Sequence, residues 1–116
     1  MALDMQGGPN WVNNFVDAPI IVNPDQHEYY RQPSYYALAH FSKFIPPGSV
    51  RVDTPVVSKA NNNCLIGAFR TPNGSTVLVA VNTEDIDIDF VAEDEKVGKL
   101  VTKIAPKSIQ TYVYYD

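Results

Sequence analysis

The triplet Pro46-Pro47-Gly48 divides this chain into two parts of different character. Neither proline can continue a helical hydrogen-bond ladder, so a helix that precedes the triplet has to end there. Pro33 suits the first turn of such a helix, where its missing N–H is not needed. Apolar residues then recur with the spacing of one helix face, at Tyr35, Leu38, Phe41 and Ile45. We therefore predict a single helix over residues 33–45.

Beyond the triplet, short β segments alternate with turns. Residues 65–70 and 75–82 flank Thr71-Pro72-Asn73-Gly74, which predicts a hairpin. Over residues 85–91 the pattern alternates, with Ile86, Ile88 and Phe90 on one face and Asp85, Asp87 and Asp89 on the other. Further strands are expected over residues 50–58 with a break at Pro55, over 98–104 and over 108–115. This spacing of short strands is typical of an antiparallel sandwich or barrel.

The first 31 residues show no such regularity and are expected to form a long structured loop. Gly7-Gly8-Pro9-Asn10 predicts a turn. Pro19 makes the apolar run 20–22 an edge strand or an extended packed loop, not a central strand. The chain should thus consist of a loop-plus-helix part at 1–48 and a β part at 49–116. The β part is short for a complete sandwich, so strands from elsewhere are expected to supplement it.

Composition excludes several classes of protein. A net charge of −4 over 116 residues argues against a nucleic-acid binder, which usually carries a basic face. The single Cys64 cannot form an intrachain disulfide, and no Cys/His cluster has the spacing of a metal site, so neither metal nor cofactor is expected. No signal peptide is visible. The abrupt apolar start at Met1-Ala2-Leu3 favours a piece of a longer chain.

The titratable residues favour structural interpretations. His27 and His40 have no Ser or Cys nucleophile in a G-x-S-x-G context to partner them, so both are expected to be packing residues. The aspartates of 85–89 have the pattern of a solvated strand face, and Glu93-Asp94-Glu95 that of a charged turn. No pair of carboxylates has a spacing that indicates acid/base catalysis.

Two short motifs carry more specific chemistry. Trp11, Asn13, Asn14 and Phe15 are residue types that bind sugars, because an aromatic face stacks on the C–H face of a pyranose while amides bond its hydroxyls. A buried loop anchor is the alternative. Asn73-Gly74-Ser75 matches the N-glycosylation sequon, and we interpret it first as a turn and second as a glycan acceptor.

One block resembles a known family. Gly7-Gly8-Pro9-Asn10-Trp11-Val12-Asn13-Asn14-Phe15-Val16-Asp17-Ala18-Pro19-Ile20-Ile21-Val22 is similar to the glucosylceramidases (acid β-glucosidases, glucocerebrosidases) of glycoside hydrolase family 30. The likeness continues through residues 30–33, 40–46 and 48–51 and is collinear to the end. It implies that 1–48 is the last strand end, catalytic-face loop and final helix of a (β/α)₈ TIM barrel. It implies that 49–116 forms the C-terminal strands of a β-sandwich, completed by strands from the amino terminus.

The resemblance also implies a function. These enzymes hydrolyse glucosylceramide to glucose and ceramide with retention, using two glutamates that lie upstream of the residues present here. The isolated chain is therefore expected to be inactive. Asn14 and Phe15 match positions at the active-site entrance, with Trp11 and Asn13 beside them. The resemblance further implies a lysosomal location, with an activator protein and a membrane surface as partners. Two alternatives stay open: a non-catalytic β module that binds carbohydrate or a partner protein, and a family 30 enzyme for another β-glycoside.

Overall fold

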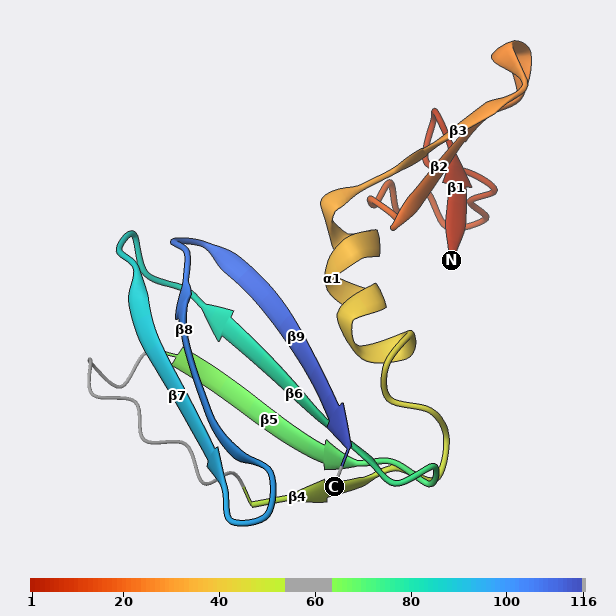
Figure 1. The fold of residues 1–116 in the computed structure, drawn as a ribbon. Helices are drawn as coiled ribbons and strands as arrows, with labels where there is room; N and C mark the ends of the chain where they lie inside the picture. Colours follow the sequence, from red (N-terminus) through yellow and green to blue (C-terminus); the bar gives the residue numbers. More distant parts are fainter. Residues whose placement is uncertain (54–63, 116) are drawn as a thin grey trace. The chain divides into compact units, whose positions relative to one another are not determined.

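In the computed structural model, residues 1–53 and 64–115 are described, and they form two compact units, Met1–Ala39 and His40–Asp116 (Figure 1). The predicted strand break at Pro55 lies outside the described residues.

The first unit contains a small three-stranded sheet in the order β1-β2-β3. Strand β2 (Ile20–Asn23) pairs in parallel with β1 (Ala2–Asp4) and antiparallel with β3 (Glu28–Arg31). A short 3₁₀ turn, η1 (Pro24–Gln26), joins β2 to β3. The sequence allows an edge strand at residues 20–22, but the prediction that the rest of 1–31 is irregular was wrong for β1 and β3.

The prediction that residues 20–22 could not form a central strand was also wrong. Pro19 comes before the first residue pair of the ladder, so its missing N–H interrupts no strand pairing. The Pro19 carbonyl oxygen still accepts a hydrogen bond from the Gln32 amide at 2.9 Å, which extends the contact between the two chain segments. A proline just outside a strand thus allows the strand to have neighbours on both sides.

Helix α1 (Pro33–Ser42) confirms the predicted helix but ends three residues earlier than expected. The amides of Phe44 and Ile45 both donate to the Phe41 carbonyl oxygen, at 3.3 and 2.9 Å, so the chain tightens into a turn before the prolines. No residue of α1 is buried, and Leu38 is 57% exposed. The apolar face that the sequence predicts is thus largely uncovered in this chain.

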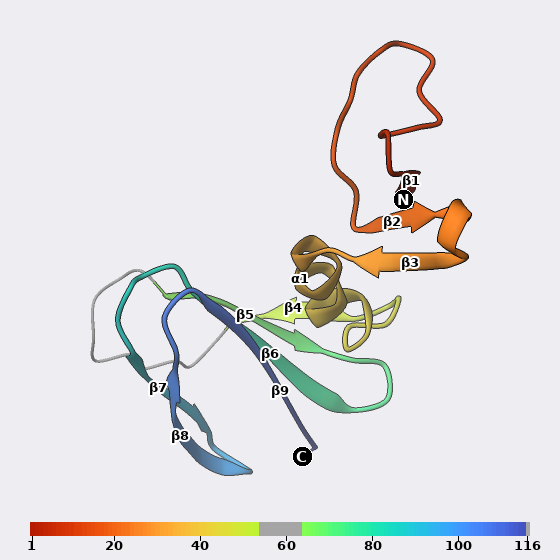
Figure 2. The ribbon, with the colours of Figure 1, turned by 90° about the horizontal axis from the view of Figure 1, so that it is seen from above.

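The second unit is an antiparallel β-sandwich of two layers (Figures 1 and 2). One layer has the order β4-β5-β6-β9, from β4 (Val50–Val52), β5 (Cys64–Arg70), β6 (Ser75–Asn82) and β9 (Ser108–Tyr115). The other is the hairpin of β7 (Ile88–Asp94) and β8 (Gly98–Ile104). The predicted hairpin around residues 71–74 is confirmed by the full register between β5 and β6.

The core of the second unit lies between these layers. Its buried members alternate along the strands, as expected for inward-facing positions: Ala68, Leu78, Ala80, Phe90, Ala92 and Ile104. The Phe90 ring stacks on Tyr112 of the other layer, with 5.6 Å between ring centroids. The alternation predicted for 85–91 holds for Ile88 and Phe90, but Ile86 precedes the strand and is 58% exposed.

Candidate functional site

The loop between β1 and β2, residues 5–19, carries the sugar-binding residues that the sequence predicts (Figure 2). Asp4 closes its base: Oδ1 accepts hydrogen bonds from the amides of Gln6 at 2.9 Å and Gly8 at 2.7 Å. The Asp4 amide in turn donates to the Gly8 carbonyl oxygen at 2.8 Å. A Cβ on Gly8 would lie 2.9 Å from Asp4 Oδ2, so a larger residue there would displace this carboxylate.

Asn10 organises the middle of the loop. Its Oδ1 accepts hydrogen bonds from the amides of Val12 at 3.3 Å and Asn14 at 3.0 Å, which holds the chain in a tight turn. Within the described residues, the buried Asn10 Nδ2 has no hydrogen-bond partner. Asn13 has a φ of 54°, the left-handed conformation that asparagine tolerates better than most residues. Side-chain acceptors and one strained residue thus shape a loop that is otherwise irregular.

This loop presents aromatic and amide side chains to solvent. Trp11 is 90% exposed and Phe15 70% exposed, and Asn13 and Asn14 are exposed as well. Phe15 lies against the Gly7 backbone, where an added Cβ would be 3.6 Å from ring atom Cδ1. Flat apolar faces beside amide donors and acceptors can bind the C–H face and the hydroxyls of a sugar. The structure brings these residues together on one loop, and their role at a pocket rim stays a prediction.

The histidines have contacts that fit a structural role. His40 Nδ1 lies 2.8 Å from Thr111 Oγ1, which ties the end of α1 to β9 within the second unit. His27 follows η1 with a φ of 55°, and its amide donates to the Pro24 carbonyl oxygen at 3.2 Å. Neither histidine contacts a nucleophilic cysteine or serine in the described hydrogen bonds.

Carboxylates act mainly as backbone acceptors. Asp94 Oδ1 accepts hydrogen bonds from the amides of Lys96 and Val97 at 2.9 and 3.2 Å. The charged turn predicted at 93–95 was therefore displaced: Glu93 and Asp94 pair within β7, and the turn covers residues 95–97. Asp17 Oδ1 accepts from the Ala18 amide at 2.7 Å. Across residues 1–53 and 64–115, no three His, Cys, Asp or Glu side chains gather as metal ligands would. The same part of the chain contains no helix long and apolar enough to cross a bilayer.

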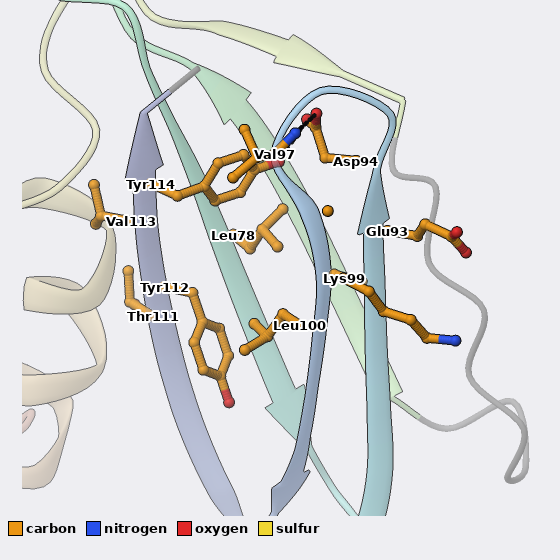
Figure 3. A pocket seen from close by; sticks show the side chains of 12 residues that line it. Leu78, Glu93, Asp94, Val97, Lys99, Leu100, Thr111, Tyr112, Val113 and Tyr114 are labelled. Carbon is orange, nitrogen blue, oxygen red and sulfur yellow. Dashed lines mark hydrogen bonds between the residues drawn. The ribbon is translucent and has the colours of Figure 1, made fainter.

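A second feature, which the sequence reasoning missed, is a pocket of about 450 Å³ in the β-sandwich. It lies between β8 and β9, where Leu78, Leu100 and Tyr112 line it with apolar side chains, whereas the Lys99 side chain extends away past β7 (Figure 3). The Tyr114 hydroxyl donates to Asp94 Oδ2 at 3.2 Å across it. Burial, and then the charge and hydrogen bond of Asp94, raise the pKa of Tyr114. The sequence signal for such a pocket was the shortness of the β part, because a sandwich that lacks strands leaves part of its core uncovered.

Comparison with known proteins places both parts of the chain. Residues 1–45 match the glycosyl hydrolase family 30 TIM-barrel domain, and residues 48–112 match the glycosyl hydrolase family 30 β-sandwich domain. The structure of SrfJ from Salmonella typhimurium aligns with 99% of the chain and with 25% of its own length, at a TM-score of 0.85 and 25% identity. These matches define the class as a glycosidase barrel end followed by a β-sandwich.

Relatives in sequence narrow the class of protein to one family. The chain belongs to glycoside hydrolase family 30. It is 43% identical over 114 residues to lysosomal acid glucosylceramidase of Mus musculus, covering 98% of this chain and 22% of that protein. It is 46% identical over 82 residues to putative glucosylceramidase 2 of Caenorhabditis elegans, covering 71% of this chain and 16% of that protein. The chain thus spans only 22% of the length of the mouse relative.

Proposed function

We propose that this chain is part of a retaining β-glucosidase that hydrolyses glucosylceramide to glucose and ceramide. The observation that carries the proposal is 43% identity to the mouse glucosylceramidase over 98% of the chain. The exposed loop around Trp11 and Phe15 supports it, because its side chains suit a substrate with a sugar and a lipid portion. Phe15 and Trp11 would supply apolar surface, and Asn14 would shape the rim of the pocket beside Asn13.

Retaining glycosidases need two carboxyl groups about 5–5.5 Å apart, one as nucleophile and one as acid/base. In our proposal both belong to barrel residues outside these 116, so this chain positions substrate and does not itself break the bond. The hydrogen bonds of Asp4, Asp17 and Asp94 support this division, because each carboxylate accepts from backbone amides in a loop or turn. The isolated chain should therefore have no glycosidase activity.

Two assays test the proposal. The purified chain should release no product from a fluorogenic β-glucoside, and clear turnover would contradict the catalytic assignment. The complete enzyme, meaning this chain joined to the remaining barrel and sandwich residues, should hydrolyse glucosylceramide in preference to other β-glycosides. A preference for another β-glycoside would contradict the proposed substrate but not the assignment to family 30.

Phe15 offers a sharper test of the loop. Burying a phenylalanine side chain against a ligand contributes roughly 1.5–3 kcal/mol, which corresponds to about tenfold or more in affinity. In the complete enzyme, Phe15→Ala should raise KM for glucosylceramide by about tenfold with a smaller change in kcat. Tyr115→Ala, at an exposed position of β9, is the matched control. An unchanged KM in the Phe15 variant would remove this loop from the binding site.

We also propose that further strands of the complete enzyme cover the pocket between β8 and β9. Both strands are at edges of their layers in the described part of the chain, so their outer backbone groups can pair with added strands. The proposed division between barrel end and sandwich falls between residues 48 and 49. A lysosomal location is part of the proposal, and the name of the mouse relative supports it. An activator protein and a membrane surface are proposed as partners on the family resemblance alone. Co-localisation with a lysosomal marker tests the location.

A further inference from the structure

The turn between β5 and β6 contains Asn73-Gly74-Ser75, the only Asn-x-Ser/Thr triplet in the sequence. The β5–β6 hairpin closes through two backbone hydrogen bonds, from the Thr71 amide to the Ser75 carbonyl oxygen at 2.9 Å and from the Gly74 amide to the Thr71 carbonyl oxygen at 3.1 Å. Thr71 and Ser75 are 5% and 3% exposed, whereas the residues between them are exposed. The turn therefore has a firmly held base and a free tip.

The orientation of the Asn73 side chain follows from its partners. The Ser75 amide, which can only donate, lies 3.3 Å from Asn73 Oδ1, and the Ser75 hydroxyl donates to the same atom at 3.0 Å. The Thr71 hydroxyl also donates to it. The carbonyl oxygen of the amide thus faces the turn, and Nδ2 faces away and donates to none of the described residues. Nδ2 is the atom that carries an N-linked glycan.

There is room at the tip for such a group. Gly74 has a φ of +86°, and a Cβ added to it would meet no atom within 4 Å. On the flank of the turn the packing is tighter, since a Cβ on Gly48 would lie 3.2 Å from Pro72 Cγ. A sugar on Nδ2 would therefore extend into open space without displacing the three hydrogen bonds to Oδ1.

We infer that Asn73 is an N-glycosylation site and that the folded turn accommodates the glycan unchanged. In the transfer, Nδ2 forms a bond to the anomeric carbon of a lipid-linked oligosaccharide, the bond from that carbon to the lipid pyrophosphate breaks, and one amide proton is released. The inference rests on the proposed function for one point: a lysosomal enzyme passes through the compartment where this transfer occurs.

The test directs the chain into the secretory pathway whatever its natural location, so its outcome depends on Asn73 alone. The 116-residue chain carrying an epitope tag and a heterologous secretion leader is expressed in insect cells, and whole-cell lysate is treated with peptide-N-glycosidase F. We expect a single mobility shift for the wild-type chain and for Ser75→Thr, which keeps both the hydroxyl and the sequon. Asn73→Asp, which keeps the acceptor oxygen, and Ser75→Ala should both lack the shift. The glucosylceramide assay tests the proposed function separately.

A second measurement tests the structural part. This measurement uses the complete enzyme, whose glycan at Asn73 should be released without denaturant because the tip of the turn is exposed. An unshifted wild-type chain, a glycan mapped to a different asparagine, or a glycan released only after denaturation would each overturn the inference.

Discussion

At the end of β6, the side chain of Asn82 joins the two layers of the sandwich. It is 1% exposed, and its Nδ2 lies 2.7 Å from the Ile86 carbonyl oxygen and 3.0 Å from those of Ile104 and Ala105. Its Oδ1 accepts a hydrogen bond from the Glu84 amide at 2.8 Å. One buried amide therefore satisfies backbone groups that two strand ends leave without partners.

Asn82→Asp should destabilise the sandwich by about 3 kcal/mol or more. The substitution removes the donors and directs a carboxylate at carbonyl oxygens, and each buried group left unsatisfied costs roughly 1–3 kcal/mol. Hydrogen exchange of β6 amides in the complete enzyme measures the change. Asp89→Asn, which exchanges the same two side-chain types on the exposed side of β7, is the control and should change little. Equal protection in both variants would contradict the role of Asn82.

The raised pKa of Tyr114 leads to a prediction of how the stability of the sandwich changes at alkaline pH. Its pKa is raised by burial first and then by Asp94, with partial opposition from Thr76 and Arg70. A raised pKa means that the folded state favours the protonated phenol, so this contribution is complete below the ordinary tyrosine pKa of about 10 and is lost as pH rises through the folded value. Wild type should thus lose more stability between pH 9 and pH 11 than Tyr114→Phe, as measured by thermal unfolding of the complete enzyme. Tyr115→Phe is the control, and parallel pH profiles for wild type and Tyr114→Phe would contradict the expectation.

At the scale of elements, the β1–β2 loop and the β5–β6 hairpin differ in how they are held. The hairpin forms a complete ladder between β5 and β6, so local turn chemistry and strand pairing agree. The loop relies on the carboxylate of Asp4 and the amide of Asn10, each of which accepts two backbone hydrogen bonds. The position of Trp11 and Phe15 therefore depends on a few side-chain contacts.

Gly8→Ala should disturb the loop more than its small size suggests. The new Cβ would be 2.9 Å from Asp4 Oδ2, so the carboxylate has to move and its bonds to the Gln6 and Gly8 amides weaken. In the complete enzyme we expect KM for glucosylceramide to rise by about threefold to tenfold, in the same direction as for Phe15→Ala. This range corresponds to about one hydrogen bond, roughly 0.5–1.5 kcal/mol. Gly98→Ala meets no atom within 4 Å but is strained by a φ of +109°, so it tests whether backbone strain at a turn glycine far from the loop has the same effect. An unchanged KM for Gly8→Ala would contradict the dependence of the loop on Asp4.

At the scale of the whole molecule, the chain exposes much apolar surface for its size. Leu38 and Phe41 of α1 are 57% and 43% exposed, and the sandwich opens into an apolar pocket between β8 and β9. Exposed apolar side chains and open apolar pockets of this kind are usually covered by another element or partner. The exposed surface fits the small share of the mouse relative that the chain spans, 22%.

The purified chain should therefore associate with itself and bind a dye that reports apolar surface. We expect its apparent mass in light scattering to rise with concentration. Replacing Leu38 and Phe41 together by Glu should lower both mass and dye binding, whereas replacing the exposed Thr83 and Asp85 by Glu should not. A monomer at all concentrations, with a sharp cooperative thermal transition and no dye binding, would contradict this expectation.

Local features were predictable from the sequence because neighbouring residues determine them. The start of α1 at Pro33, the turn at residues 71–74 and the alternation of Ile88 and Phe90 all follow from steric preferences and periodicity within a few residues. The grouping of Trp11 with Asn13, Asn14 and Phe15 on one loop was equally a matter of sequence neighbours. The exposure of these four side chains could not be predicted from the sequence, since the same residue types suit both a buried anchor and an open site.

Only the tertiary structure determined the pairings between segments that are distant in sequence. Ala2 pairs with Ile20 in a parallel ladder, which makes β2 central, although Pro19 alone indicates an edge. Asn82 bonds Ala105 across the sandwich, and β8 and β9 leave a pocket between them. These outcomes depend on which strand edges and faces meet, and each is stabilised by partners distant in sequence. The triplet at residues 46–48 marks where a helix must end and β structure begins, but the partners of the strands that follow depend on the fold.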